Sequence, residues 1–206
     1  MSELTDPEKR ILEAAKQVFE KHGFDGARMQ QIADETGISK ASLHYYFRSK
    51  EKLFDLIFEE TMAEFLALVS TWEDDSDLQA WEQKLRSFIQ QFFNALRTKS
   101  LLFILREIHR NPELLIAWKN RLKSPRKKNR FIAYFEKLKE LDLIEDLDMT
   151  VIFIFLHSLC AYPVINEQMF RLSTQLTDKD FEKTMNAYPD QVADFLINGL
   201  RKKQKH

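Results

Sequence analysis

The sequence predicts an all-α protein. The chain of 206 residues contains only 4 glycines and 5 prolines, the two residue types that weaken helices most. Its hydrophobic content of 44% is enough to fill one or two compact helical units. Apolar residues also recur at helical spacing, as Leu12, Ala15 and Phe19 do near the start of the chain. Together these observations favour helices throughout.

The first part of the chain shows clear start signals for helices. Asp6 and Pro7 open a helix that is expected to reach about Lys21, because proline suits the first helical position. A helix-turn-helix is expected over 31–50, and a long helix over 50–71. The apolar stripe of the long helix comprises Leu53, Ile57, Phe58, Met62, Phe65 and Leu66.

The remainder of the chain is expected to consist of helices separated by short breaks. A kink is expected at Pro163, because proline cannot donate the interior hydrogen bond of a helix. The last helix is expected to follow Pro189 and to end near Gly199, before a basic tail. The other expected helices span 78–97, 100–109, 113–122, 125–141 and 148–171.

The helix-turn-helix signal rests on a few residues with defined backbone roles. Gly37 can adopt the left-handed conformation that ends a helix, and Ile38 then supplies the apolar plug of the turn. The hydroxyl of Ser39 is placed to cap the next helix. Leu43 and Phe47, four residues apart, turn inward. The outer face and its flanks then carry Lys40, Ala41, Ser42, His44 and Tyr45, groups that suit a DNA groove.

An ordered set of residues runs through the first quarter of the chain: Arg10-Ile11-Leu12, Ala14-Ala15, Phe19, Gly23-Phe24, Ile32-Ala33, Gly37-Ile38-Ser39-Lys40, Leu43, Tyr46-Phe47, Ser49-Lys50 and Leu53. In this order, the segment from Lys9 to about Leu56 resembles the DNA-binding domain of the TetR family of bacterial transcriptional regulators. The rest of the chain resembles the family in its helical format and overall length. Ala27-Arg28 stand where members usually carry Thr or Ser, and His44 stands where tyrosine is common.

The resemblance implies a domain organisation and a function. Residues 1–49 are expected to form a three-helix DNA-binding domain, and residues 50–206 a larger helical domain for effector binding and dimerisation. The implied function is that of a sequence-specific transcriptional regulator, usually a repressor released from its operator by a small-molecule effector. The expected partners are double-stranded operator DNA, that effector and a second copy of the chain.

The DNA contacts are expected to be local, because the formal net charge of the chain is only -1. Between Glu35 and Glu51 the chain contains no acid but three bases, Lys40, Arg48 and Lys50. Residues expected at or near base edges are Lys40, Ser42 and His44, with Gln30 from the preceding helix, and Ala41 is expected on the same DNA-binding surface. Residues expected to hold phosphates are Arg28, Tyr45, Tyr46 and Lys50.

Aromatic residues crowd the part of the chain after the helix-turn-helix, and most sets of this kind are core packing. Polar residues lie among them and could orient a bound small molecule in a mostly apolar pocket. The candidate pocket residues are Phe103, Arg106, His109, Phe131, Tyr134, His157 and Tyr162.

Two further segments have alternative interpretations. The segment 151–165 is apolar nearly all round, which suits a central core helix or, as the resemblance implies, a dimer interface. The segment from Lys119 to Arg130 carries seven bases and no acid. It fits a solvated helix face, an anionic effector site or a second nucleic-acid contact.

Other classes of protein are not favoured by the sequence. A single cysteine, Cys160, excludes an internal disulfide and fits a reducing cytoplasm. No signal peptide is visible, and the longest apolar run, 151–156, is far shorter than the ~20 residues of a membrane span.

No catalytic motif or cofactor motif is present. His157 and Cys160 could form half of a metal site, but packing is the commoner role. The alternatives to a DNA-binding regulator are a helical interaction module, and a ligand-binding protein or enzyme with a remnant DNA-binding domain.

Overall fold

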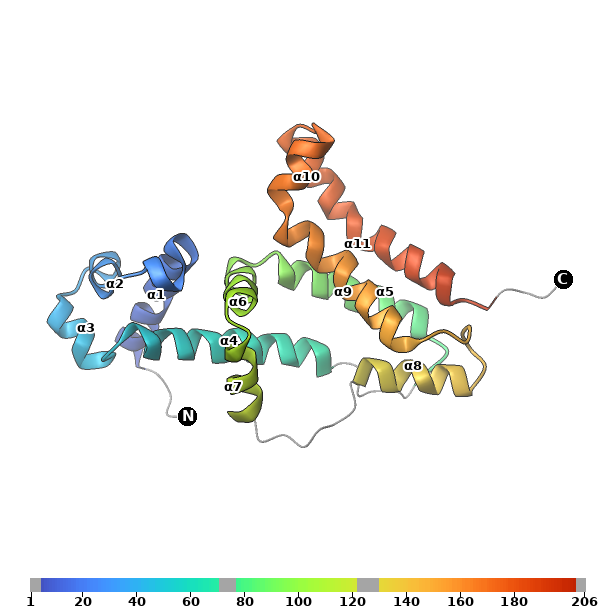
Figure 1. Cartoon of the computed structure of the whole chain (residues 1–206), viewed down its shortest axis with the longest axis horizontal. Helices are drawn as coiled ribbons and strands as arrows, with labels where there is room; N and C mark the ends of the chain where they lie inside the picture. The colour runs from blue at the N-terminus through green and yellow to red at the C-terminus, as the bar shows by residue number, and fades with distance from the viewer. Residues whose placement is uncertain (1–4, 71–76, 122–129, 203–206) are drawn as a thin grey trace. The chain divides into compact units, whose positions relative to one another are not determined.

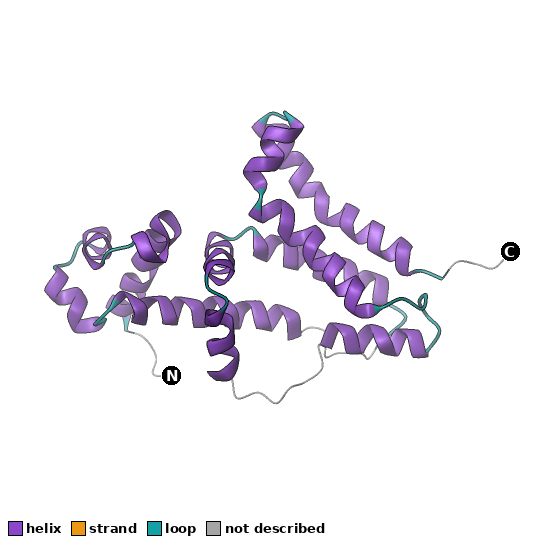
Figure 2. Ribbon diagram, in the orientation of Figure 1, coloured by secondary structure: helices purple, strands orange, loops and turns teal. Residues whose placement is uncertain are grey.

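The computed structural model describes residues 5–70, 77–121 and 130–202, and within these residues it contains eleven helices and no strand (Figures 1 and 2). The predicted all-α class is therefore confirmed. The helices are α1 (Asp6–Gly26), α2 (Met29–Thr36), α3 (Lys40–Tyr46), α4 (Lys50–Ser70), α5 (Trp81–Leu96), α6 (Lys99–Arg110), α7 (Glu113–Arg121), α8 (Arg130–Glu140), α9 (Met149–Ile165), α10 (Glu167–Thr174) and α11 (Asp178–Leu200).

The chain divides into two compact units. The first unit combines Met1–Glu64 with Lys99–Lys123, and the second combines Phe65–Thr98 with Ser124–His206. Helices α6 and α7 therefore belong with the amino-terminal helices, although they follow them by many residues in the sequence. The functional division between residues 1–49 and 50–206 remains a prediction.

The first unit is built around α1. The helix packs against α2 on one side and α6 on another, and Ile11, Ala15 and Phe19 on its inner face are at most 1% exposed. The ring of Phe19 is stacked on that of Phe103 from α6 at 6.0 Å and meets Phe54 of α4 edge to face at 6.1 Å. Aromatic packing therefore joins helices that are distant in the sequence.

The turn between α2 and α3 has the predicted conformation. Gly37 is left-handed, with φ 73° and ψ 26°, and the N–H of Ile38 donates to the carbonyl of Ala33 at 3.1 Å. This bond satisfies a carbonyl at the end of α2. The hydroxyl of Ser39 accepts from the N–H of Ser42 at 3.0 Å, and Leu43 is fully buried. The predicted cap, turn and inward face are confirmed.

The second unit packs α5, α8, α9 and α11 together. Its core contains the fully buried side chains Leu85, Ile89, Phe93, Phe135, Leu138, Leu156 and Cys160. An ion-pair network on its surface joins Arg171 to Glu167 at 2.7 Å, Asp178 at 2.9 Å and Glu182 at 2.6 Å. Glu182 also pairs with Arg97, which directly follows α5, so the network ties the end of α5 to α10 and α11.

The last helix differs from its prediction. We expected it to follow Pro189, but α11 begins at Asp178, where the hydroxyl of Thr177 accepts from the N–H of Asp180 at 3.2 Å. Pro189 lies inside α11 and is buried, as are Met185 before it and Val192 after it. Burial along α5 and α9 outweighs the loss of the one backbone bond that proline cannot make.

The predicted helix over 148–171 is divided in two. Asp148 caps its start as expected, since its carboxylate accepts from the N–H of Thr150 at 2.8 Å. The break lies at Asn166, three residues after Pro163, and α9 and α10 are bent by 77° there. No single helix of the described segments is long and apolar enough to cross a membrane; α9 and α10 together meet that test only as this bent pair.

Other boundaries lie close to the predicted ones. The regular part of α1 is interrupted at Gly23, where φ is 69°, two residues after the predicted end. Helix α8 begins at Arg130, and the predicted segment 125–129 lies outside the described residues. Most of the basic segment that starts at Lys119 also lies outside them.

Replacing Gly37 with alanine should destabilise the fold by about 1–2 kcal/mol, because a Cβ disfavours the left-handed backbone. No atom lies within 4 Å of the added carbon, so backbone strain is the sole expected cost. Gly199→Ala is the matched control. Gly199 is helical with equally open surroundings, and alanine there should stabilise by up to about 1 kcal/mol. Urea unfolding measures both, and equal effects would contradict the assigned turn.

Candidate nucleic-acid interface

The outward face of α3 carries the side chains that the sequence singled out. Lys40, Ala41, Ser42 and His44 are exposed, and Tyr45 is 84% exposed. The opposite face of the same helix is buried through Leu43. The helix therefore presents a compact row of polar and aromatic groups on a fixed support, an arrangement suited to a groove.

Two polar groups on this face have defined local partners. The hydroxyl of Ser42 lies 2.9 Å from that of Ser39, and Nδ1 of His44 lies 3.2 Å from the carbonyl oxygen of Arg48. Because a carbonyl can only accept, this contact requires the hydrogen of His44 to sit on Nδ1. In the tautomer with its only ring hydrogen on Nδ1, Nε2 can act as an acceptor.

Helix α2 supplies the other predicted contacts. Arg28 stands at its start, and the side chain of Gln31 accepts from the N–H of Arg28 at 2.8 Å. This bond is the glutamine half of a capping box; the hydroxyl half is absent, because the Arg28 side chain makes no cap hydrogen bond. The amide of Gln30 donates to the carboxylate of Asp34 at 2.8 Å, so Gln30 must exchange this partner before it can reach a base.

A groove beside α3 adds a residue that the sequence reasoning missed. Its volume is about 620 Å³, and its lining includes Arg10 and Pro7 of α1 together with Tyr45 and Tyr46. The two tyrosine rings meet edge to face at 5.3 Å. Arg10 directly precedes the buried residue Ile11, so periodicity places it at the rim of the buried face. Its position beside α3 follows from tertiary packing, which no local pattern reveals.

Lys50 has an unexpected environment. Its ammonium group donates to the carbonyl oxygens of Phe24 at 2.8 Å, Ala27 at 3.3 Å and Asp25 at 3.4 Å. It also lies 4.6 Å from the centre of the Phe24 ring. These carbonyls close the end of α1, where unpaired acceptors favour a cation. The predicted phosphate contact of Lys50 remains a prediction; in this structure Lys50 joins the start of α4 to the turn between α1 and α2.

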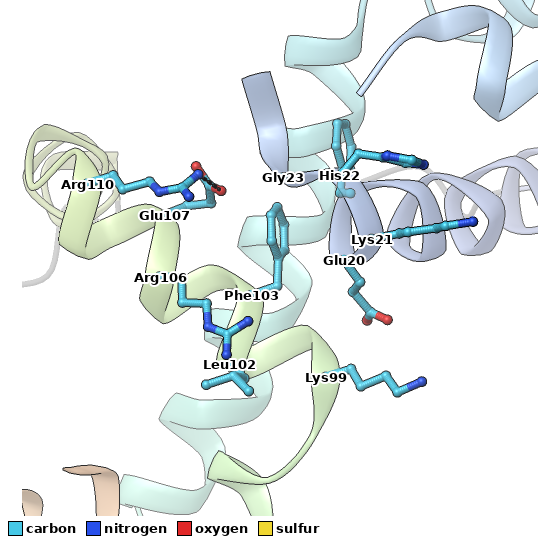
Figure 3. Close-up of a pocket in the computed structure, with 11 residues that line it drawn as sticks. Glu20, Lys21, His22, Gly23, Lys99, Leu102, Phe103, Arg106, Glu107 and Arg110 are labelled. Carbon is cyan, nitrogen blue, oxygen red and sulfur yellow. Dashed lines mark hydrogen bonds and ion pairs between the residues drawn. The ribbon is translucent and has the colours of Figure 1, made fainter. Parts of the chain in front are cut away.

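The predicted effector-pocket residues belong to both units. Phe103 and Arg106 line a cavity of about 350 Å³ in the first unit (Figure 3), and His109 is exposed there. In the second unit, Phe131 and Tyr134 are buried, and Tyr162 is 52% exposed. Phe131 and Tyr134 are therefore part of the core, whereas His109 and Tyr162 lie at the surface. The predicted pocket residues do not all line one cavity.

His157 is the polar member with the clearest environment. Its ring lies 4.0 Å from that of Phe153 and 5.0 Å from that of Phe92, and its Nδ1 donates to the carbonyl of Phe153 at 2.9 Å. Burial lowers the pKa of His157 and raises the pKa of Cys160 to about 12. Cys160 is therefore a protonated packing thiol at neutral pH. No cluster of three or more potential metal ligands occurs in the described part of the chain.

The fold and the exposed face of α3 define an all-helical protein with an amino-terminal helix-turn-helix. The model of the family "Bacterial regulatory proteins, tetR family" matches residues 11–57. The amino-terminal part of the chain, which contains the helix-turn-helix, is therefore similar to the regulators of this family.

Curated relatives are similar over the same part of the chain. The HTH-type transcriptional regulator RutR of Escherichia coli (strain K12) is 40% identical over 67 residues, which cover 32% of each chain. The HTH-type transcriptional repressor NicS of Pseudomonas putida is 46% identical over 55 residues, or 27% of this chain and 26% of NicS. The matched segment thus spans about a third of the length of these relatives or less.

A solved structure resembles the whole fold. FadR from Bacillus subtilis, a transcriptional regulator in complex with stearoyl-CoA, has a TM-score of 0.58 and 17% sequence identity. The similarity covers 93% of this chain and 98% of FadR. At this identity it shows that the fold is shared.

Changing Lys50 to methionine should destabilise the protein by about 1–2 kcal/mol, because the carbonyls at the end of α1 lose a charged donor. Methionine keeps an apolar stem of similar length. Lys52→Met on the exposed side of α4 is the control and should change stability by less than about 0.5 kcal/mol. Urea unfolding compares the two, and equal stability of both variants would show that the Lys50 contacts contribute little.

Proposed function

We propose that the chain is a sequence-specific, DNA-binding transcriptional regulator that acts in the cytoplasm. The observation that carries this proposal is α3 itself, whose buried face holds Leu43 and whose outer face exposes Lys40, Ser42 and His44. A helix presented in this way fits the major groove. The names of RutR and NicS, a transcriptional regulator and a repressor, support the same function and favour repression.

Base recognition is assigned to the outer face of α3. Lys40 can donate to guanine, and Ser42 can donate or accept. Nε2 of His44, as the acceptor, can take a hydrogen bond from an amino group of adenine or cytosine. Gln30 is the fourth candidate, after it exchanges its bond to Asp34.

Phosphate contacts are assigned to the flanks of this face. Tyr45 and Tyr46 are exposed at the end of α3, and Arg28 is exposed at the start of α2. Arg10 lines the groove next to both tyrosines. The first turn of α4, capped by Ser49, offers free backbone N–H groups that favour anions. These groups fix the position of the protein on DNA and carry little sequence information.

A dimer is proposed because α9 and α11 expose large apolar side chains. Ile154 is 53% exposed, Phe155 48% and Phe195 67%, and the two helices pack against each other within the second unit. Such side chains favour an isologous interface with a second copy of the chain. Two-fold symmetry would then place two copies of α3 in successive major grooves.

A small-molecule effector is proposed to release the dimer from DNA. FadR, with its shared fold, is described in complex with stearoyl-CoA, so this architecture can hold a small-molecule ligand. Release requires that the effector bind more tightly to a conformation in which the spacing of the two α3 helices no longer fits the operator.

Two groups of variants should separate base contacts from phosphate contacts. Lys40→Ala and His44→Ala should change the preferred sequence, with a cost of about 1–3 kcal/mol on the original site. Tyr46→Phe and Arg28→Ala should weaken binding to all sequences alike. Selection from a random DNA pool, followed by fluorescence anisotropy, measures both effects. Identical behaviour of the two groups would refute the assignment, and failure to select any DNA would favour an interaction module.

The double variant Ile154→Asp/Phe195→Asp should be monomeric at micromolar concentration, because two carboxylates per chain cannot be buried in an apolar interface without large cost. Sedimentation velocity measures the oligomeric state. Ile116→Asp is a matched control, since Ile116 on α7 is 52% exposed but lies outside α9 and α11. A dimer that survives in the double variant would place the interface elsewhere.

A further inference from the structure

The cavity between the end of α1 and α6 has an unusual combination of walls (Figure 3). Its volume is about 350 Å³, enough for a small organic molecule. Phe19 and Phe103 form a stacked aromatic pair on one wall. Lys99 and Arg106 supply positive charge from α6. All of these residues belong to the first unit.

The two cations are arranged along one face of α6. Lys99 and Arg106 are seven residues apart, which is about two helical turns and about 10 Å. Leu102 lies between them on the intermediate turn, so an apolar surface separates the two charges (Figure 3). Within the described segments, neither Lys99 nor Arg106 forms an ion pair with a carboxylate.

The acids of the cavity already have partners. A carboxylate oxygen of Glu20 accepts from the hydroxyl of Ser100 at 3.0 Å. Glu107, whose side chain is only 8% exposed, pairs with Arg110 at 3.4 Å and accepts from the N–H of Phe24 at 3.4 Å. The lining carries four cations, Lys21, Lys99, Arg106 and Arg110, against two acids, Glu20 and Glu107, so a net positive charge remains available to a ligand.

We propose that this cavity binds a small amphipathic anion, a carboxylate or phosphate group attached to an apolar body. The guanidinium of Arg106 can hold such a group in two parallel hydrogen bonds, and Lys99 adds a second charge. Leu102 and Phe103 cover the apolar body. A neutral ligand of the same shape gains the apolar contact without the ionic one.

The cavity also adjoins a continuous set of contacts that leads to α3. Arg110 holds Glu107, Glu107 holds the backbone N–H of Phe24, and the carbonyl of Phe24 accepts from Lys50 at the start of α4. Gly23, beside Arg110 and Glu107, has a positive φ of 69°, a backbone conformation that favours glycine.

Arg110 also lines the cavity, so an anion held by Arg106 can attract the guanidinium of Arg110. If Arg110 leaves Glu107, the buried carboxylate is left without a cation, which is costly. Glu107 must then move, and its hold on Phe24 weakens. Because Lys50 follows α3 closely in the sequence, the change reaches the end of the reading helix. This consequence for DNA binding rests on the proposed function, whereas binding of the anion does not.

Calorimetry on the full chain with 2-naphthoate tests the site. We expect 2-naphthoate to bind at least about tenfold more tightly than its neutral counterpart 2-naphthamide, as a charge-assisted pair implies. Phenyl phosphate, as a second probe, shows whether the site prefers a phosphate to a carboxylate. Arg106→Gln should weaken both anions about tenfold, and the control Lys183→Gln, on the exposed face of α11, should not.

Three results would overturn the site: equal affinity for naphthoate and naphthamide, unchanged affinity in Arg106→Gln with an unchanged melting temperature, or failure of both anions to bind.

A fluorescence anisotropy titration of a selected DNA fragment then tests the coupling between the anion site and DNA binding. Saturating naphthoate should change the DNA affinity at least about fivefold in the wild type and not in Arg106→Gln. An unchanged DNA affinity would refute the coupling, and failure to select any DNA would refute the proposed function; the calorimetric result stands in both cases.

Discussion

The position of α3 depends on how its two ends are held. At its start, the left-handed Gly37 and the Ser39 cap fix it to α2. Four residues beyond its far end, Lys50 bonds to three carbonyls at the end of α1. With Leu43 buried between these points, the outer face of the helix has one orientation. Precise reading of DNA requires that kind of rigid support.

The features that could be predicted from the sequence are those set by local backbone chemistry. Gly37, Ser39 and Asp148 act within a few residues of themselves, so their roles as turn and caps follow from residue type and spacing. The start of α11 is not set by local chemistry: proline favours a helix start, but burial on both sides keeps Pro189 inside the helix. The contacts of Lys50 are not set by local chemistry either, because its partner Phe24 is 26 residues away.

The candidate site was predictable in part for the same reason. The outward direction of Lys40 and His44 follows from helical periodicity around buried Leu43. The position of Arg10 beside Tyr45 and the division of the effector-pocket residues between two units follow from tertiary packing. A chain of near-neutral charge, -1 overall, must therefore concentrate its DNA contacts on this small surface and gain affinity by presenting it twice.

The most direct test of the central claim is the symmetry of the DNA that the wild-type chain selects from a random pool. If a dimer presents two copies of α3, the enriched sequence should contain two inverted half-sites whose centres are about 10 base pairs apart, or a multiple of that spacing. Enrichment of a single half-site would contradict dimeric reading. Absence of any enriched sequence would contradict the reading role of α3.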